Sequence, residues 1–372
     1  MTKIDKDKLI IGAAGPVLAL VSSFVLTVLV LLATGLDPIE PIRLMIDNAA
    51  YSDIQVLIVN QTGIYYLASL AVAVGFQMNL FNIGVDGQYR LAAMLSALVG
   101  AAVDLPGPLH ILLIVLVATA TGAFWAGIAG VLKTTRGVSE VVSTIMLNSI
   151  TTALVAWLIL PKNFGEQPAG SNNLTTGDIP ESGWFPGIDM GDGNGVIYGF
   201  TFVALALGVV YWFVLNRTRF GFDLRATGAS ESAAQASGVD AKKMILTSML
   251  ISGGLAGLSG MPTLLGETHT YSLDFPVGVG FTAIAIALLG RNHPVGILFA
   301  SLLFAFLEKA SSTLDTEGYP KEITEIMKGI IVIAVVVSYE LVRRYGLRRQ
   351  QQKVGEQLAA GGALTTDKEV AA

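Results

Sequence analysis

Long runs of residues without a charged side chain recur from one end of the 372-residue chain to the other. Such a run can cross the hydrocarbon core of a bilayer as a helix if it holds about 20 mostly apolar residues. Helices satisfy their own backbone hydrogen bonds where no water is present. Charged residues make up only 14% of the chain, against about 25% in typical soluble domains. The sequence therefore predicts an all-α, polytopic membrane protein.

The charge-poor runs predict about ten membrane-spanning helices. The first run is longer than the core of a signal peptide and lacks a convincing cleavage site, so we expect it to be a retained span. The third, eighth and ninth runs are short, and eight or nine full crossings remain an alternative. The predicted spans are 10–34, 55–77, 88–103, 109–132, 139–160, 196–216, 243–264, 277–290, 295–311 and 323–342.

Positive charges favour one orientation, with both termini and the even-numbered loops in the cytoplasm. The opposite loops are mostly acidic, and the segment 161–195, rich in Gly, Pro, Asn and Asp, is predicted to be the large external loop. Residues 1–345 would form the membrane domain and residues 346–372 a mobile cytoplasmic tail. The positive residues assigned to the cytoplasm are Lys3, Lys6, Lys8, Lys133, Arg136, Arg217, Arg219, Arg225, Lys242, Lys243, Arg343, Arg344, Arg348, Arg349 and Lys353.

The residue inventory argues against an enzyme and against an internal energy source. The dipeptide Gly-Lys of a nucleotide-binding phosphate loop does not occur, and there is no cysteine. The three histidines are scattered without metal-ligand spacing. His269 is expected to be a solvated residue of an external loop, and contact with a polar substrate near the outer mouth is the alternative. Ion-coupled transporters usually carry charges deep within their spans. Here Asp86, Arg90, Glu140 and Glu308 are all placed at predicted span ends, so an ion-coupled secondary transporter is the alternative rather than the preferred reading.

The predicted cytoplasmic loop 217–243 contains a short capped helix. Ser230 is placed to cap its first turn, Glu231 complements the positive end of the helix dipole, and Gly238 supplies a left-handed stop. We expect this helix to dock on a cytoplasmic subunit. A plain solvated connector is the alternative interpretation.

Two glycine-punctuated segments occupy comparable places in the two halves of the chain. They are 81–88, with the sequence Phe-Asn-Ile-Gly-Val-Asp-Gly-Gln, and 278–282, with the sequence Gly-Val-Gly-Phe-Thr. Broken helices in matched positions point to a transport pathway, because unpaired backbone groups are tolerated where they line a cavity. Close helix packing is the alternative, and it is the preferred explanation for Gly254, Gly257 and Gly260.

These motifs resemble one family when they are taken together and in order. The stretches 80–88, 225–238, 251–260 and 278–290 are similar to the branched-chain amino acid and sugar class of ABC importer permeases, and most similar to its nucleoside and simple-sugar group. The similarity covers most of residues 25–340. Many members have glutamate where this chain has Asp86, which shortens the reach of the carboxylate.

The resemblance implies a transport subunit of an ATP-driven importer for nucleosides or simple sugars, in a bacterial cell membrane. Its expected partners are a second related permease, a cytoplasmic ATPase that binds the ATP, and an external substrate-binding protein; no cofactor is expected in this chain. The pathway hypothesis places Asn82, Asp86, Gln88 and Phe281 near the bundle centre, where they would meet ribose hydroxyls and a base. The residues expected to couple to the ATPase are Arg225, Gly228, Ser230, Glu231, Ala233, Ala234 and Gly238.

Overall fold

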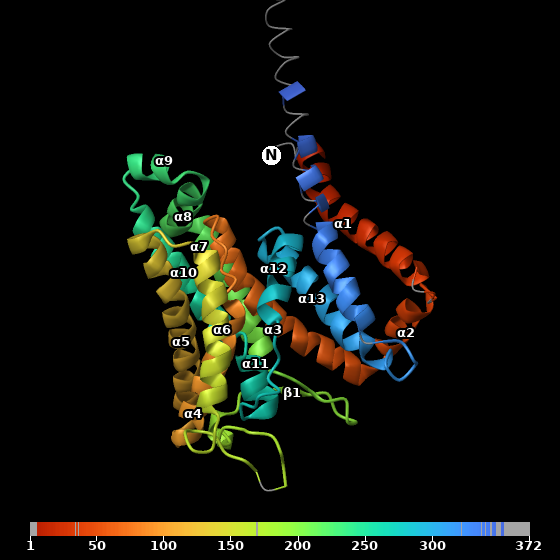
Figure 1. Cartoon of the computed structure of the whole chain (residues 1–372), viewed down its shortest axis with the longest axis vertical. Coiled ribbons are helices and arrows are strands. Elements are labelled where there is room, and N and C mark those ends of the chain that lie inside the picture. Colours follow the sequence, from red (N-terminus) through yellow and green to blue (C-terminus); the bar gives the residue numbers. More distant parts are fainter. Residues whose placement is uncertain are drawn as a thin grey trace, which may run out of the picture. The chain divides into compact units, whose positions relative to one another are not determined.

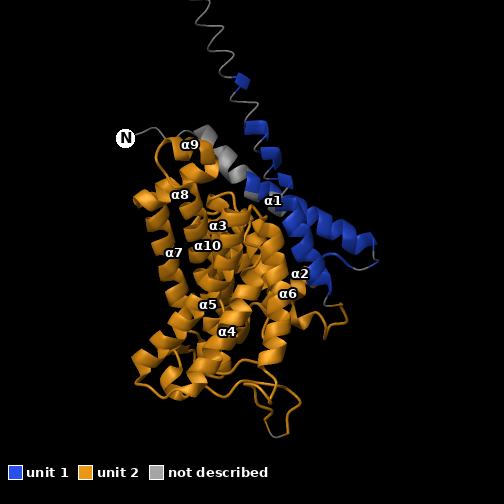
Figure 2. Ribbon diagram, turned by 60° about the vertical axis from the view of Figure 1, so that its left-hand side comes forward, with its two compact units in different colours: residues 1–40, 322–372 blue, residues 41–321 orange. Residues whose placement is uncertain are grey.

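The structure is a computed structural model in which two compact units are distinguished (Figure 2). One unit comprises residues 41–321, and the other comprises residues 1–40 together with 322–372. Nearly all of the predicted tail 346–372 lies outside the described residues. The described residues are 6–33, 35, 37–168, 170–320, 322–335, 337–338, 340–342, 344–346 and 351–352.

Helices account for almost all of the regular structure, so the predicted helical membrane bundle is confirmed (Figure 1). The smaller unit contains α1 (Lys6–Ala33) and a helical stretch from 322 to 335. In the order of the chain, the longer helices that follow α1 are α2 (Glu40–Asn48), α3 (Ser52–Gln77), α4 (Val85–Ala102), α5 (Gly107–Arg136), α6 (Glu140–Leu158), α7 (Phe200–Arg217), α8 (Arg219–Ala229), α10 (Ala241–Leu258), α12 (Val279–Leu289) and α13 (Pro294–Ala310).

Short elements complete the chain between these helices. The helix α9 (Glu231–Ala236) follows α8, and α10 continues through α11 (Met261–Thr263) into a π-helical turn, η2 (Leu264–Thr268). The remaining elements are the 3-10 turns η1 (Glu181–Gly183) and η3 (Ser311–Thr313) and the strands β1 (Ile188–Asp189) and β2 (Val196–Ile197).

Six of the described helices are long and apolar enough to cross a membrane: α3, α5, α6, α7, α10 with its continuation to Thr268, and α13 with η3. The most apolar stretch of α3 is 89% buried, against 33% for α5, α6 and α7, so α3 is the central helix of its unit. The predicted short helices are also present. With 11 residues, α12 is about 16 Å long, roughly half the thickness of the hydrocarbon core.

Small residues allow α5 and α10 to approach until their backbones touch. A Cβ atom at Gly122 would lie 2.1 Å from the carbonyl oxygen of Gly253, and one at Gly257 would lie 2.2 Å from that of Ala118. A Cβ at Gly254 would lie 3.2 Å from the side chain of Thr119. Glycines at this spacing allow close helix packing. Close packing is also the interpretation preferred from the sequence for the glycines of the seventh predicted span.

The segment 161–195, predicted to be the external loop, is held at the end of the bundle opposite α8 and α9 (Figure 1). Thr175 forms isolated β-bridges with Glu166 and with Ser272, and β1 pairs with β2 as a small antiparallel hairpin. His269, expected to be a solvated loop residue, is half-buried in the loop after η2. Its ring stacks on Trp184, with 3.9 Å between the ring centroids. Burial lowers the pKa of this histidine, although the nearby Asp178 acts in the opposite direction.

Candidate functional site

A pair of side-chain amides holds the linker between α3 and α4. Asn82 Nδ2 donates to Gln88 Oε1, and Gln88 Nε2 donates back to Asn82 Oδ1, each over 2.9 Å. Asn82 Nδ2 also donates to Ser252 Oγ over 2.8 Å, and Ser252 Oγ donates to the carbonyl of Ala71 over 2.6 Å. Both amides are at most 1% exposed. Because an unpaired buried amide costs about 1–3 kcal/mol, this cluster ties the linker to α3, α4 and α10.

Asn148 of α6 satisfies the backbone on the other side of the same linker. Its Nδ2 donates to the carbonyl of Ile83 over 3.0 Å, and its Oδ1 accepts from the N–H of Gly87 over 2.9 Å. A Cβ at Gly87 would lie 2.7 Å from that oxygen, so glycine is needed for α6 to come this close. One signal marks Asn148 in the sequence: it is an amide within an uncharged span, where a buried polar group needs partners.

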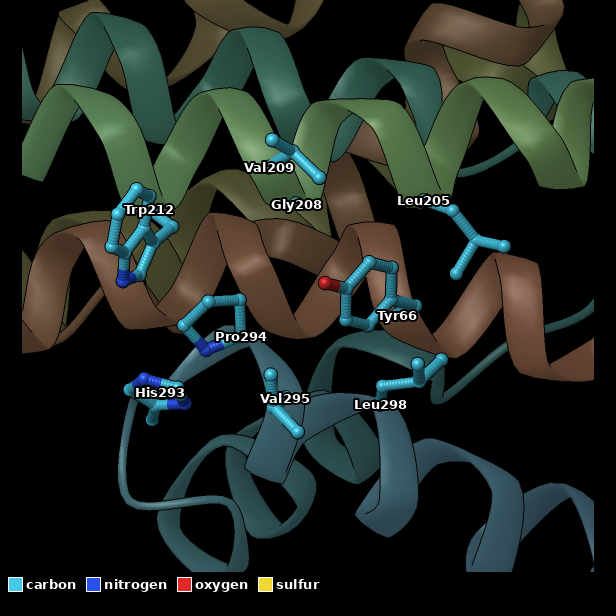
Figure 3. A pocket seen from close by; sticks show the side chains of 9 residues that line it. All are labelled: Tyr66, Leu205, Gly208, Val209, Trp212, His293, Pro294, Val295 and Leu298. Carbon is cyan, nitrogen blue, oxygen red and sulfur yellow. The ribbon is translucent and has the colours of Figure 1, made fainter.

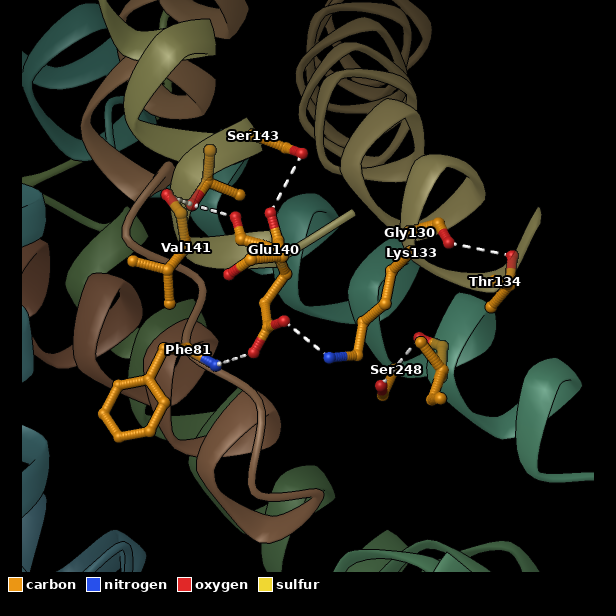
Figure 4. A network of polar contacts seen from close by, with 11 residues as sticks. Phe81, Gly130, Lys133, Thr134, Glu140, Val141, Ser143 and Ser248 are labelled. Atoms are coloured by element: carbon orange, nitrogen blue, oxygen red, sulfur yellow. Dashed lines mark hydrogen bonds and ion pairs between the residues drawn. The ribbon is translucent and has the colours of Figure 1, made fainter. Parts of the chain in front are cut away.

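An ion pair reaches the same linker from the ends of α5 and α6 (Figure 4). Lys133 Nζ lies 2.6 Å from Glu140 Oε2, while Glu140 Oε1 accepts from the N–H of Phe81 over 3.3 Å. The glutamate side chain is 8% exposed and the lysine side chain 25% exposed. Sequence reasoning placed Lys133 among the charges of a cytoplasmic loop and Glu140 at a span end. The structure joins them into one buried support for the linker.

The starts of the two short helices α4 and α12 meet at a carboxylate. Asp86, in the first turn of α4, accepts a hydrogen bond from the N–H of Gly278 over 2.7 Å. Gly278 has a φ of 83°, and a Cβ at Gly280 would lie 2.5 Å from the backbone nitrogen of Asp86. Helix N-termini carry partial positive charge, so this carboxylate is stabilised from both sides. The two glycine-punctuated segments predicted from the sequence are therefore in direct contact.

An aromatic cluster lies along the chain between η2 and this meeting point. The ring of Phe275 lies 4.8 Å from that of Tyr271 and 5.5 Å from that of Tyr89, measured between centroids. Tyr89 Oη donates to the carbonyl of Pro276 over 2.9 Å. The non-helical stretch 271–278 thus runs along α4 and brings Gly278 to Asp86.

A second polar cluster lies between α3, α12 and α13. Tyr65 is 3% exposed and hydrogen-bonds to the carboxylate of Glu308. Gln61 and Thr282 lie beside the same tyrosine hydroxyl. Glu308 is close to the end of α13, as its place in the sequence predicts, but its carboxylate reaches the middle of α3. Tyr65 and Gln61 lie four residues apart on one helical face, which is the sequence signal that identifies them.

The four residues predicted to line a pathway fall into two groups. Asn82, Asp86 and Gln88 converge on the start of α4 and are at most 8% exposed. The side chain of Phe281 is instead 59% exposed, although its neighbour Gly280 touches Asp86. The predicted convergence is found for the three polar residues, while Phe281 presents its ring outward from α12. Their contact with a transported molecule stays a prediction.

The predicted capped helix of the 217–243 loop is present as α9. Ser230 Oγ accepts from the N–H of Ala233 over 3.3 Å, and Gly238 has a φ of 84° after the helix ends. Arg225 donates to the carbonyl of Leu215, which closes the turn between α7 and α8. Figure 1 shows α8 and α9 at one extremity of the larger unit.

This loop rests directly on the end of α3. A Cβ at Gly228 would lie 2.4 Å from the carbonyl oxygen of Gln77, the last residue of α3. Ala234 faces inward and is 3% exposed, whereas Glu231 and Ala233 are exposed. Of the two alanines predicted for docking, Ala233 is therefore the accessible one, and Ala234 instead anchors α9.

Metal ligands do not cluster in the part of the chain that the structure describes. His110 is fully buried, with its two ring nitrogens 2.8 Å from Ser182 Oγ and 2.9 Å from the carbonyl oxygen of Gly100. Its polar atoms thereby join α4, α5 and the segment 161–195.

Replacing Glu140 should destabilise the protein. Glu140→Leu removes the partner of Lys133 and the acceptor of the Phe81 N–H, so we expect a loss of about 1–3 kcal/mol in the free energy of unfolding. Asp47→Asn is the matched control, because Asp47 pairs with Arg43 across 3.8 Å and both side chains are at least 67% exposed. Thermal unfolding in detergent measures both variants. Equal midpoints would contradict a structural role for the buried pair.

Gly280→Ala should disturb the contact between α4 and α12. The added Cβ would meet the backbone nitrogen of Asp86 at 2.5 Å, and overpacking of this kind costs about 1–3 kcal/mol. Gly329→Ala is the control, since its Cβ would have no neighbour within 4 Å. The yield of monodisperse protein and its unfolding midpoint provide the comparison. A Gly280→Ala variant as stable as the control would show that the helices are not packed this closely.

Comparison with known proteins identifies relatives that match most of the chain. It is 37% identical over 286 residues to the guanosine ABC transporter permease protein NupP of Bacillus subtilis, covering 74% of this chain and 79% of the relative. It is 32% identical over 333 residues to the nucleoside ABC transporter permease protein NupB of Lactococcus lactis, covering 87% and 90%. The glucose ABC transporter permease protein TsgB13 of Haloferax volcanii is 30% identical over 336 residues, covering 89% and 88%.

No solved structure matches the chain significantly. The family match itself extends over residues 54–336, from α3 through α13 and beyond. It includes the amide pair, the Asp86 contact and the 217–243 loop, so the whole candidate site lies within the matched region. The chain belongs to the family of permease components of branched-chain amino acid transport systems.

Proposed function

We propose that this chain is the membrane permease subunit of an ATP-driven importer for nucleosides, with simple sugars as the second substrate class. The relatives named for guanosine, for nucleosides and for glucose support this choice. The buried polar groups along α3 and α4 also suit a solute that is rich in hydroxyl groups.

Permeases of ABC transporters work in general with an ATPase and a substrate-binding protein. For this chain we propose a cytoplasmic ATPase that binds the ATP, an external binding protein and a second, related permease. The pair of guanosine permeases NupP and NupQ from Bacillus subtilis, both similar to this chain, supports the heteromeric arrangement. We place the chain in a bacterial cell membrane with both termini in the cytoplasm, as the positive charges favour.

The contact between Gly228 and the end of α3 is the observation that carries the mechanism. A force applied to α9 reaches α8, then Gln77, and then the linker that holds Asn82. This linker is bonded through its amides to Gln88 and Ser252. Motion of the coupling loop is therefore delivered to the polar core without crossing a flexible segment.

The proposed pathway opens where α4 and α12 meet. Displacement of the α3–α4 linker would strain the hydrogen bond between Asp86 and Gly278, which joins the starts of α4 and α12. The amide groups of Asn82 and Gln88 satisfy each other while this contact is closed. Once separated, they would offer donors and acceptors to the hydroxyls of a ribose, and Phe281 would offer its exposed ring to a base.

Ala233→Asp should lower uptake strongly without affecting folding. Ala233 is exposed on α9, so a carboxylate there is tolerated in the free subunit but is desolvated when an ATPase docks, which costs several kcal/mol. We expect ATP-dependent nucleoside uptake in proteoliposomes to fall about tenfold or more. Ala233→Ser, which stays small, serves as the control and should retain transport. Undiminished uptake in the aspartate variant would remove α9 from the docking surface.

Phe281→Ala should reduce the preference for nucleosides over simple sugars. Stacking of a base on an aromatic ring contributes about 1–3 kcal/mol, so the ratio of nucleoside to sugar uptake should fall about fivefold or more. Phe281→Tyr keeps an aromatic ring and should keep the preference. Competition uptake with labelled nucleoside and unlabelled sugar measures this ratio. An unchanged ratio in the alanine variant would exclude stacking by Phe281 as a source of selectivity.

A further inference from the structure

An apolar groove of about 400 Å³ lies between α7 and α13 (Figure 3). Tyr66 of α3 and Gly208 of α7 form part of its lining, and a Cβ at Gly208 would lie 1.9 Å from Tyr66 Oη. Glycine at this position makes room for the tyrosine. Both α7 and α13 pack on α3, and the groove lies where these two outer helices diverge.

The walls of the groove face outward from a membrane-spanning part of the chain. Leu205 and Val209 belong to one wall, Val295 and Leu298 to the other. Val209 is 67% exposed and Val295 is 55% exposed. In a bilayer, apolar side chains exposed on the outside of a bundle contact hydrocarbon, so the groove has the chemistry to accept a lipid acyl chain.

At one end, the residues that line the groove lie beside a positive charge, that of Arg217. Trp212 and His293 lie together at that end, away from Leu205 and Leu298 (Figure 3). The guanidinium carbon of Arg217, at the end of α7, lies 5.6 Å from the centre of the Trp212 ring. None of the residues lining the groove is acidic. Tryptophan is typical of the membrane interface, and basic residues beside such a groove attract anionic headgroups.

We propose that this groove is a binding site for an anionic phospholipid. The acyl chain lies against Val209 and Val295, and the phosphate of the headgroup lies at the end marked by Trp212, Arg217 and His293. Tyr211 Oη donates to the carbonyl of Asn292 over 2.9 Å and so fixes α7 to the turn before α13 at this end. A bound lipid would fill the space beside that contact and stabilise the spacing of the two helices.

Fluorescence quenching by brominated lipid provides the experiment, because Trp212 lies in the proposed site. The full-length protein is placed in phosphatidylcholine nanodiscs that contain a minor fraction of brominated phosphatidylglycerol or of brominated phosphatidylcholine. We expect the Trp212 signal, defined as the difference between the wild type and Trp212→Phe, to be quenched at about a fivefold lower fraction of the anionic lipid. Equal quenching by the two lipids would overturn the proposal and indicate only an annular lipid.

Two sets of variants separate the headgroup from the chain. Arg217→Gln combined with His293→Gln should abolish the preference for the anionic lipid, while Arg219→Gln should keep it, because the Arg219 side chain is 94% exposed. Val209→Phe should fill the groove and weaken quenching by both lipids, while Val142→Phe, on the exposed surface of α6, should not. A preference that survives the double substitution, or that Arg219→Gln removes equally, would contradict the site. These outcomes do not depend on which solute is transported.

Discussion

The need to satisfy backbone groups without water governs the central part of this permease. The chain leaves helical structure after α3 and again before α12, inside a bundle where each unpaired backbone group costs several kcal/mol. Side chains from several helices form hydrogen bonds with these backbone groups. Asn148 pairs with the carbonyl of Ile83 and the N–H of Gly87, Glu140 with the N–H of Phe81, and Asp86 with the N–H of Gly278. These backbone groups of the irregular segments therefore have side-chain partners in place of helical ones.

The same bonds make the linker after α3 a point of convergence. It touches α6 through Asn148 and α10 through Ser252, and it follows directly on the helix end against which Gly228 packs. A two-state change at this linker would be felt by all of these elements at once, since packed interfaces shift between discrete arrangements rather than deform continuously. This arrangement suits a transporter whose energy arrives from another subunit.

Much of the fold follows from the sequence, because lipid restricts the choice of structure. The helices can be located from the length of the uncharged segments and from the requirement that backbone groups in lipid form internal hydrogen bonds. Local chemistry predicts the cap at Ser230 and the left-handed Gly238, both of which are present. The partners of polar residues were harder to predict. Lys133 and Glu140 were assigned to different roles, and the inward face of Ala234 was missed, because side-chain pairing depends on how helices approach one another in space. Periodicity within a single helix carries no information on that approach.

The inward position of Ala234 has a mechanical consequence for the proposed coupling. A surface helix that is anchored by a buried side chain moves as a rigid body with the elements beneath it. A helix held only at its ends would bend, and its displacement would not be transmitted. If the contacts of Ala234 were weakened, the ATPase could therefore still bind α9 and hydrolyse ATP while the transport pathway stayed closed. ATP hydrolysis would then be uncoupled from transport. The cause would lie in the packing beneath α9, while the surface that binds the ATPase stayed unchanged.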